Sequence, residues 1–297
     1  MTFIALILII LSAGLHAAWN FLSKAGTPSI GYFFLTNLAA TAATLPFTIF
    51  GPVEYTALPL RFWGVVFCSV MCEMAYVTAL ANGYRKAEIS FFYPMSRSLP
   101  VVFTFILCSI LGIGKTLSAA AMVGMVLVTL GCLILPIQKF SNIRLQDYFN
   151  STMPFVLLGA CGTTGYTIFD SSACNYLYTQ TGSSLVVALG YLGVIEVGIL
   201  SGTSLVLCFS AKERANARIL CRKVSPYMSG IFSVGAYGLV LVAMGLVTNV
   251  SFIQAFRQLS LPIGVALGIF VLKERVTLPK ILGVATLLTG LILSAVK

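Results

Sequence analysis

Charged residues are scarce in this chain of 297 residues. They make up 9% of the sequence, against about 25% in an ordinary soluble domain. A soluble fold cannot cover its surface with so few charges, which excludes a cytosolic enzyme and a disordered chain. Hydrophobic residues make up 59%, and the mean hydropathy is +1.00. These values predict an all-α, multi-pass membrane protein that has the lipid bilayer as its surroundings.

Histidine and acidic residues are also few. His16 is the only histidine, and 8 Asp and Glu residues stand against 18 Lys and Arg residues. The sequence offers no cluster of metal ligands and no phosphate-binding glycine loop beside a strand. We therefore expect no enzymatic activity, no metal and no cofactor, and an ATP-driven pump is excluded for this chain alone. In a membrane protein the net charge of +10 indicates topology rather than binding to nucleic acid.

Long apolar segments fill the chain instead. A helix that spans a bilayer needs about 20 mostly apolar residues, and ten such segments follow one another with mostly short connections. They lie near residues 3–22, 29–50, 62–82, 89–111, 117–136, 153–175, 184–208, 226–247, 249–271 and 280–296. The sequence therefore predicts ten transmembrane helices and leaves no stretch for a soluble domain.

The two halves of the chain resemble each other. Residues 98–103 read SLPVVF, and residues 260–265 read SLPIGV. A pair of glycines seven residues apart follows each motif. These pairs are Gly124 with Gly131 and Gly283 with Gly290. The shared pattern indicates an internal repeat of five spans plus five spans.

Because five is an odd number, the two repeats must sit upside down relative to each other. Inverted repeats are typical of transporters, whose binding site lies at the repeat interface near the middle of the membrane. We predict a first repeat at 1–136, a connecting loop at 137–152 and a second repeat at 153–297, arranged around a central cavity.

Basic residues are shared unevenly between the two faces of this arrangement. The connections after the first, third, fifth, seventh and ninth spans hold 13 of the Lys and Arg residues, whereas the opposite face holds Arg61, Lys115 and Lys297. The positive-inside rule then places the basic connections in the cytoplasm and both chain ends outside.

Four motifs carry a resemblance to a known family. They are HAAWNFLSK at 16–24, AEISFFYPMSRSLP at 87–100, GYTIFD at 165–170 and LKERVTLPKILGVATLLTGLIL at 272–293. Together with the five-plus-five pattern, they resemble the EamA family of the drug/metabolite transporter superfamily, in a subgroup with HAAWN and YPMSR motifs. The resemblance covers essentially the whole chain.

The resemblance implies a ten-helix basket in the bacterial inner (plasma) membrane that works by alternating access. It also implies transport of amino acids or other small polar compounds, and members of the subgroup are associated with phosphonate utilisation. Better-studied relatives have both ends in the cytoplasm, opposite to the charge count, so the resemblance and the charges leave orientation open.

Two arginines lie deep inside predicted spans. Arg97 is about nine residues into the fourth span and Arg257 about eight into the ninth, which at roughly 1.5 Å per residue puts both near the middle of a core about 30 Å thick. A guanidinium binds carboxylate or phosphonate oxygens through two parallel hydrogen bonds. The two arginines are therefore candidate substrate contacts on facing walls of one cavity. The alternative is that each pairs with a membrane glutamate and only holds helices together.

Three carboxylates also fall inside spans. Glu73 and Glu196 are central in the third and seventh spans, and Asp170 lies nearer the end of the sixth. A membrane carboxylate that faces a cavity is a candidate proton carrier, and the alternative is a permanent ion pair with Arg97 or Arg257. For Asp170, gating or helix capping is as reasonable as contact with the substrate.

Further polar side chains share these helices. His16, Trp19 and Asn20 lie on consecutive turns of the first span, where a lone histidine is more often a helix contact than a ligand and Trp19 also suits an interfacial aromatic belt. Tyr93 accompanies Arg97, and Gln254 and Gln258 accompany Arg257. We count all six as candidate cavity residues.

The sequence thus favours a secondary transporter for a small polar, anionic or zwitterionic metabolite such as an amino acid or a phosphonate-like compound. A lipid-linked carrier or flippase that uses the same basket is the alternative. The expected partners are a small-molecule substrate and protons as a candidate coupling ion, with the chain a monomer or homodimer. A membrane scaffold without transport fits poorly with so many charges inside spans.

Overall fold

The structure, a computed structural model, is built from helices. It describes residues 3–86, 89–113, 118–135, 137, 139–140, 151–270 and 276–295, without the side chains of 24–25, 89–91, 93–95, 267–268 and 295. Within these ranges every regular element is a helix and none is a strand. The predicted connecting loop at 137–152 lies largely outside the described residues.

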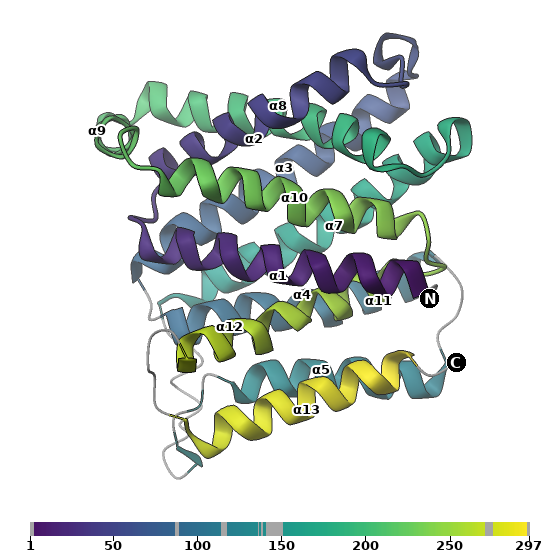
Figure 1. The fold of residues 1–297 in the computed structure, drawn as a ribbon, viewed down its shortest axis with the longest axis vertical. Coiled ribbons are helices and arrows are strands. Elements are labelled where there is room, and N and C mark those ends of the chain that lie inside the picture. Colours follow the sequence, from purple (N-terminus) through teal and green to yellow (C-terminus); the bar gives the residue numbers. More distant parts are fainter. Residues whose placement is uncertain are drawn as a thin grey trace.

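The five segments predicted in the first half each coincide with one helix (Figure 1). The helices are α1 (Phe3–Ala25), α2 (Ile30–Phe50), α3 (Leu60–Lys86), α4 (Ile89–Leu111) and α5 (Ala119–Ile134), with a short 3-10 turn, η1 (Tyr55–Ala57), before α3.

The second half departs from the predicted segments at two places. A short helix lies in the basic connection at 209–225, and the ninth segment is divided at Arg257 by a 3-10 turn. The elements are α7 (Met153–Thr181), α8 (Leu185–Phe209), α9 (Ala211–Leu220), α10 (Ser225–Met244), α11 (Val250–Phe256), η3 (Arg257–Leu259), α12 (Ser260–Phe270) and α13 (Leu278–Ala295).

Helix length and composition suit a membrane. Among the described residues, α1, α2, α3, α8 and α10 are long and apolar enough to cross one. Shorter apolar helices lie at Ser96–Leu111, Ala119–Ile134 and Leu278–Ser294. The chain is thus a helical protein compatible with a bilayer, and the crossing of the bilayer by all ten segments stays a prediction.

Serine side chains fix where several helices begin. Ser29, Ser118, Ser184 and Ser210 each accept a hydrogen bond from a backbone N–H in the first turn of α2, α5, α8 and α9. Such a cap satisfies an N–H group that has no partner within the helix. The connections therefore end at these serines, directly before the next helix.

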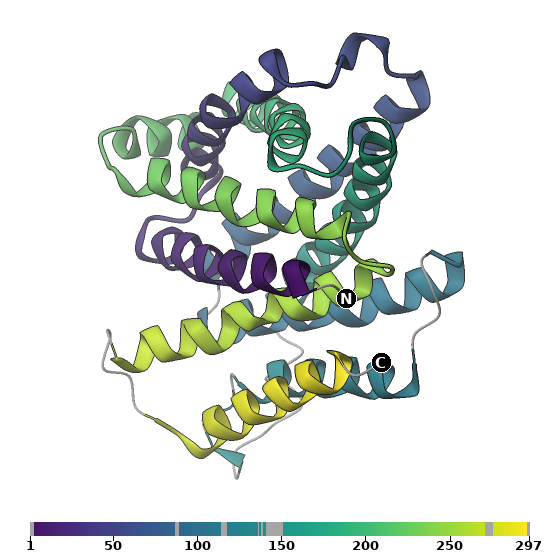
Figure 2. The same ribbon diagram turned by 45° about the vertical axis from the view of Figure 1, so that its right-hand side comes forward.

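The helices pair across the two predicted halves. The most extensive contacts join α5 with α13, α3 with α7, α1 with α10 and α2 with α8. Each pair takes one helix from each half, and Figure 2 shows α5 and α13 side by side at the edge of the molecule. If each helix is replaced by its counterpart in the other half, α1 becomes α7 and α10 becomes α3, so the pair of α1 with α10 becomes the pair of α7 with α3. The set of four pairs therefore stays the same. Inverted repeats would give this pattern.

The two glycine pairs seen in the sequence meet at the crossing of α5 and α13. A Cβ atom on Gly124 would lie 2.6 Å from the carbonyl oxygen of Gly290, and one on Gly131 would lie 2.7 Å from that of Gly283. No larger residue allows two backbones to approach this closely without a shift, so the glycines bring the last helices of the two halves into direct contact.

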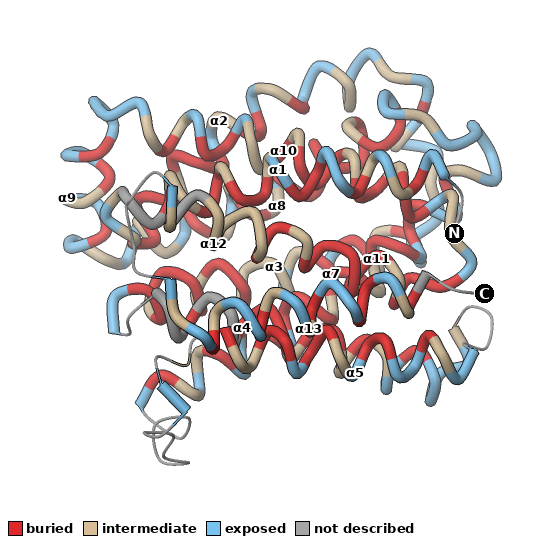
Figure 3. The backbone as a smooth tube through the Cα atoms, turned by 60° about the horizontal axis from the view of Figure 1, so that its bottom comes forward, coloured by how far each residue is buried: buried red, intermediate tan, exposed pale blue. Residues whose placement is uncertain are grey.

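Buried residues gather between the helices and exposed ones cover the outside (Figure 3). Many of the exposed side chains are large and apolar, among them Ile110 at 76% and Ile292 at 71% exposure. An outer surface of this kind fits surrounding lipid better than water. The two chain ends lie at one end of the bundle and α9 at the other (Figures 1 and 3).

Candidate functional site

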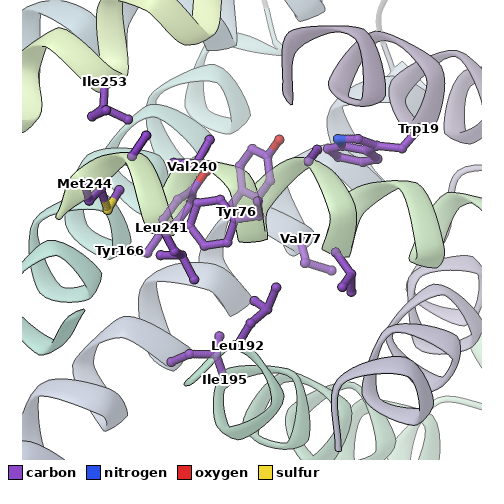
Figure 4. Close-up of a cluster of buried hydrophobic side chains, with 14 of the residues drawn as sticks. Trp19, Tyr76, Val77, Tyr166, Leu192, Ile195, Val240, Leu241, Met244 and Ile253 are labelled. Atoms are coloured by element: carbon purple, nitrogen blue, oxygen red, sulfur yellow. The ribbon is translucent and has the colours of Figure 1, made fainter. Parts of the chain in front are cut away.

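A cavity of about 70 Å³ lies between helices of both halves. Its walls come from α1, α2 and α3 in the first half and from α7, α8, α10 and η3 in the second. Figure 4 shows three of its wall residues, Trp19, Tyr76 and Leu192, which come from α1, α3 and α8. The polar wall residues are His16, Thr36, Asn37, Glu73, Tyr76, Tyr166, Glu196, Ser233, Tyr237 and Arg257.

Arg257 is the cation of this wall. Its side chain is 2% exposed and lies in η3, where the ninth segment is divided. The guanidinium donates to the hydroxyl of Tyr166 over 3.0 Å and to Oε1 of Gln254 over 3.5 Å. It also lies 5.3 Å from the centre of the Tyr237 ring and 5.7 Å from that of Tyr166, a cation–π arrangement.

Arg257 has no carboxylate partner among the described residues. No Asp or Glu oxygen described in the structure lies within 4.0 Å of its guanidinium nitrogens. Its Nε atom is buried and makes no hydrogen bond. The alternative of a direct ion pair with a membrane glutamate therefore does not describe this residue. The guanidinium keeps donor capacity on the cavity wall.

Three other cavity residues also carry buried polar atoms without a hydrogen-bond partner. They are Nε2 of His16, Nδ2 of Asn37 and Oε2 of Glu196. Nδ1 of His16 accepts a hydrogen bond from the indole of Trp19 over 2.8 Å, so the ring proton of a neutral His16 lies on Nε2. A buried polar group without a hydrogen-bond partner destabilises the folded protein by about 1–3 kcal/mol. Together with Nε of Arg257, three kinds of N–H donor without a partner thus belong to residues of the cavity wall.

Both predicted mid-span glutamates belong to this wall. Glu73 lies at the middle of α3 and is half-buried, and Glu196 lies at the middle of α8 with 7% exposure. Among the described residues neither forms an ion pair within 4.0 Å. The structure thus places the two candidate proton carriers and Arg257 on one cavity.

Asp170 lies well inside α7, because the helix continues to Thr181 instead of ending near 175 as predicted. Its carboxylate is fully buried and accepts hydrogen bonds from Ser69, Tyr237 and, over 2.7 Å, Tyr191. The three donors come from α3, α10 and α8. Asp170 therefore joins four helices, and one of its three donors, Tyr237, lines the cavity and has its ring beside Arg257.

Arg97 and Arg257 occupy different surroundings, unlike the facing positions expected. Arg97 is not among the residues that line the cavity. Its Nη2 atom donates to Oγ of Ser260 over 2.9 Å, and Ser260 in turn donates to the carbonyl oxygen of Arg257. Arg97 thus braces α4 against the start of α12, one turn beyond Arg257.

The remaining predicted residues are divided between the cavity and its support. His16 and Trp19 line the cavity, whereas Asn20 donates to the carbonyl oxygen of His16 over 2.7 Å. Gln254 and Gln258 are fully buried and do not line the cavity. Gln254 accepts from Arg257, and Gln258 donates to the backbone of Gln254. The side chain of Tyr93 lies outside the described residues.

Sequence reasoning missed six polar wall residues: Thr36, Asn37, Tyr76, Tyr166, Ser233 and Tyr237. The chain has 12 tyrosines, and nothing in their local sequence distinguishes those that converge on Arg257. Tyr166 does lie in the GYTIFD motif, four residues before Asp170 and on the same helix face. That spacing is a sequence signal that could have pointed to it.

Comparisons with known proteins support the fold only. No protein-family model and no curated protein matches the chain. One solved structure, described only as "Crystal structure of protein", superposes with a TM-score of 0.68 at 14% identity. The match covers 98% of this chain and 95% of the other. The whole chain therefore shares its fold with a protein of known structure.

Proposed function

We propose that the chain is a secondary transporter of the EamA type, which moves a small anionic or zwitterionic metabolite by alternating access. One observation carries the proposal: Arg257, which has no carboxylate partner among the described residues, lines a cavity beside unpartnered N–H donors of His16 and Asn37. These groups suit the oxygens of a carboxylate or phosphonate.

The composition of the wall supports the same substrate class. Glu73 and Glu196 offer oxygens to an ammonium group, and Trp19, Phe33 and Tyr76 offer apolar surface to the body of a solute. A cavity with one guanidinium and two carboxyl groups suits a zwitterion as well as an anion. The contacts between halves support alternating access, because the walls belong to helices that pair across the predicted repeat.

Purified protein in a thermal-shift screen would test the proposal first, against amino acids, phosphonates, other small anions and a set of small cations. We expect an anionic or zwitterionic compound to raise the melting temperature. Proteoliposomes preloaded with that compound should then exchange it for labelled compound outside. Stabilisation by cations or lipids alone, without exchange of any stabilising solute, would contradict the proposal.

A further inference from the structure

The short helix α9 (Ala211–Leu220) turns its acidic residue inward. Glu213, Ala217 and Leu220 are its buried residues, and the helix packs mainly on α2. Oε2 of Glu213 accepts from the backbone N–H of Gly31 over 3.0 Å, and Oε1 lies 3.6 Å from Nη1 of Arg85. The only acidic residue of segment 209–225 is therefore engaged by α2 and α3.

The outward side of the same segment is strongly basic. Lys212, Arg214, Arg218, Arg222 and Lys223 are all exposed. Arg214 bends back and donates to the carbonyl oxygens of Leu207 and Cys208 at the end of α8, over 2.7 and 2.6 Å. We call the other four residues the basic face. Because Glu213 is turned away, no acidic residue of the segment neutralises it.

Large apolar side chains stand beside this basic face. Phe209 is 85% exposed, Ile219 is 68% exposed and Val224 is 71% exposed. Phe209 ends α8, one of the helices suited to cross a membrane, and Val224 directly precedes α10, another. A short helix that combines Lys and Arg with exposed apolar residues at such a position typically lies in the membrane interface.

We propose that the basic face binds the headgroups of anionic phospholipids in the adjacent leaflet, with Ile219 and its apolar neighbours inserted among the acyl chains. Basic clusters at the membrane end of a helix attract anionic lipid by about 1 kcal/mol per Lys or Arg. The positive-inside rule accounts for the number of charges in this segment. It does not account for a helix whose acid is turned inward while its apolar residues remain exposed.

The test uses the full purified chain in neutral detergent with short-chain phosphatidylglycerol or phosphatidylcholine, and native mass spectrometry counts the lipid bound. Arg218→Gln/Arg222→Gln removes two exposed charges, one in the last turn of α9 and one directly after the helix. Arg61→Gln, an exposed arginine at the start of α3, is the matched control. Inorganic phosphate serves as competitor, to separate a lipid site from a site for a soluble anion.

We expect the parent and Arg61→Gln to prefer phosphatidylglycerol over phosphatidylcholine. The double variant should bind phosphatidylglycerol roughly 30-fold more weakly, or about fivefold per arginine. The proposal would be overturned if the double variant preferred phosphatidylglycerol as strongly as the parent does. It would also be overturned if Arg61→Gln lost as much binding as the double variant, or if phosphate displaced the lipid.

A second measurement needs no variant. In the unaltered chain, salt raised from about 0.1 M to about 1 M shortens the screening length from roughly 10 Å to 3 Å. The preference for phosphatidylglycerol should therefore decrease as the salt concentration rises. A preference that does not change with salt would also overturn the proposal.

Discussion

At the scale of single residues, Arg257 is a buried cation that has no carboxylate partner among the described residues. A charge inside a membrane protein is unfavourable by several kcal/mol unless other groups compensate it. Here the compensation is the hydroxyl of Tyr166 and the faces of two tyrosine rings, without a carboxylate among the described residues. Neutral partners stabilise the cation and leave its positive charge available to a guest. This is the arrangement that a binding residue needs and a structural ion pair lacks.

The hydrogen bonds around Asp170 lead to a prediction about stability. Asp170→Asn keeps the size of the side chain but has one carbonyl oxygen for three hydroxyl donors. At least one buried hydroxyl then loses its acceptor, so we expect the free energy of unfolding to fall by about 1–3 kcal/mol.

Thermal unfolding in detergent measures the effect of Asp170→Asn. Tyr191→Phe is the matched comparison, because it removes one donor and leaves the carboxylate with two. Its loss should be smaller than that of Asp170→Asn. Parent-like melting of Asp170→Asn would show that the three hydrogen bonds do not hold the four helices together.

The two cavity glutamates lead to a prediction about coupling. Glu73 and Glu196 face the same cavity as Arg257, so we expect protons to couple through one of them. Glu→Gln at that residue should abolish uptake driven by a pH gradient and preserve exchange of substrate in liposomes. Glu54→Gln, on an exposed residue before η1, is the control. If Glu73→Gln and Glu196→Gln both respond to the gradient like the parent, proton coupling through these residues is wrong.

The charged part of the site could be predicted from the sequence, because a charge within an apolar span stands out at once. Arg257, Glu73 and Glu196 were found in this way. The tyrosines around Arg257 were not, since an aromatic residue in an apolar span is unremarkable in sequence. The different surroundings of Arg97 were also hidden, because they depend on how α4 meets α12.

At the scale of elements, hydropathy located the long helices to within a few residues, except at the end of α7, which continues to Thr181 instead of ending near 175. It missed α9 because that helix is polar and short, and its stability comes from Glu213 and its neighbours against α2. It also missed the 3-10 turn at Arg257, because hydropathy does not register a local change of helix type within an apolar run.

The crossing of α5 and α13 gives a prediction about glycine. A Cβ atom on Gly290 would lie 2.6 Å from both the carbonyl oxygen of Gly124 and the nitrogen of Val128. Gly290→Ala should therefore push the helices apart and destabilise the protein by about 1–3 kcal/mol. Gly14→Ala in α1 is the control, because nothing lies within 4 Å of its Cβ position.

Gly14→Ala should leave stability unchanged or raise it by up to about 1 kcal/mol, because alanine favours a helix over glycine. Urea or thermal unfolding of the two variants in the same detergent makes the comparison. Equal stability of Gly290→Ala and Gly14→Ala would mean that the helices do not approach as closely as the structure shows.

At the scale of the whole molecule, the symmetry of contacts connects the fold to the proposed activity. Every major helix pair joins the two predicted halves, and the cavity lies between them. A relative movement of the halves would change the cavity walls on both sides at once. The repeat seen in the sequence therefore fits with a mechanism in which access alternates around a fixed site.

The placement of the chain ends gives a prediction about topology. Both ends lie at the end of the bundle opposite to α9 (Figures 1 and 3), which lies in the connection with the largest group of basic residues, 209–225. The positive-inside rule then puts α9 in the cytoplasm and both ends outside. Fusions at the C-terminus to alkaline phosphatase and to green fluorescent protein decide this. An inactive phosphatase fusion together with a fluorescent protein fusion would place the C-terminus in the cytoplasm and contradict this prediction.

The most direct test of the account compares Arg257→Lys with Arg97→Lys, by substrate affinity and melting temperature measured on the same purified proteins. Lysine keeps the charge and loses the planar fork. Arg257→Lys should weaken binding of an anionic or zwitterionic substrate by roughly 10-fold to 100-fold, because a lost hydrogen bond to a charged group is worth about 1.5–3 kcal/mol. Arg97 does not line the cavity, so Arg97→Lys should bind the substrate with the affinity of the parent, even if its melting temperature is lower. Unchanged affinity in a stably folded Arg257→Lys protein, or an equal loss in both, would contradict the claim that Arg257 binds the substrate.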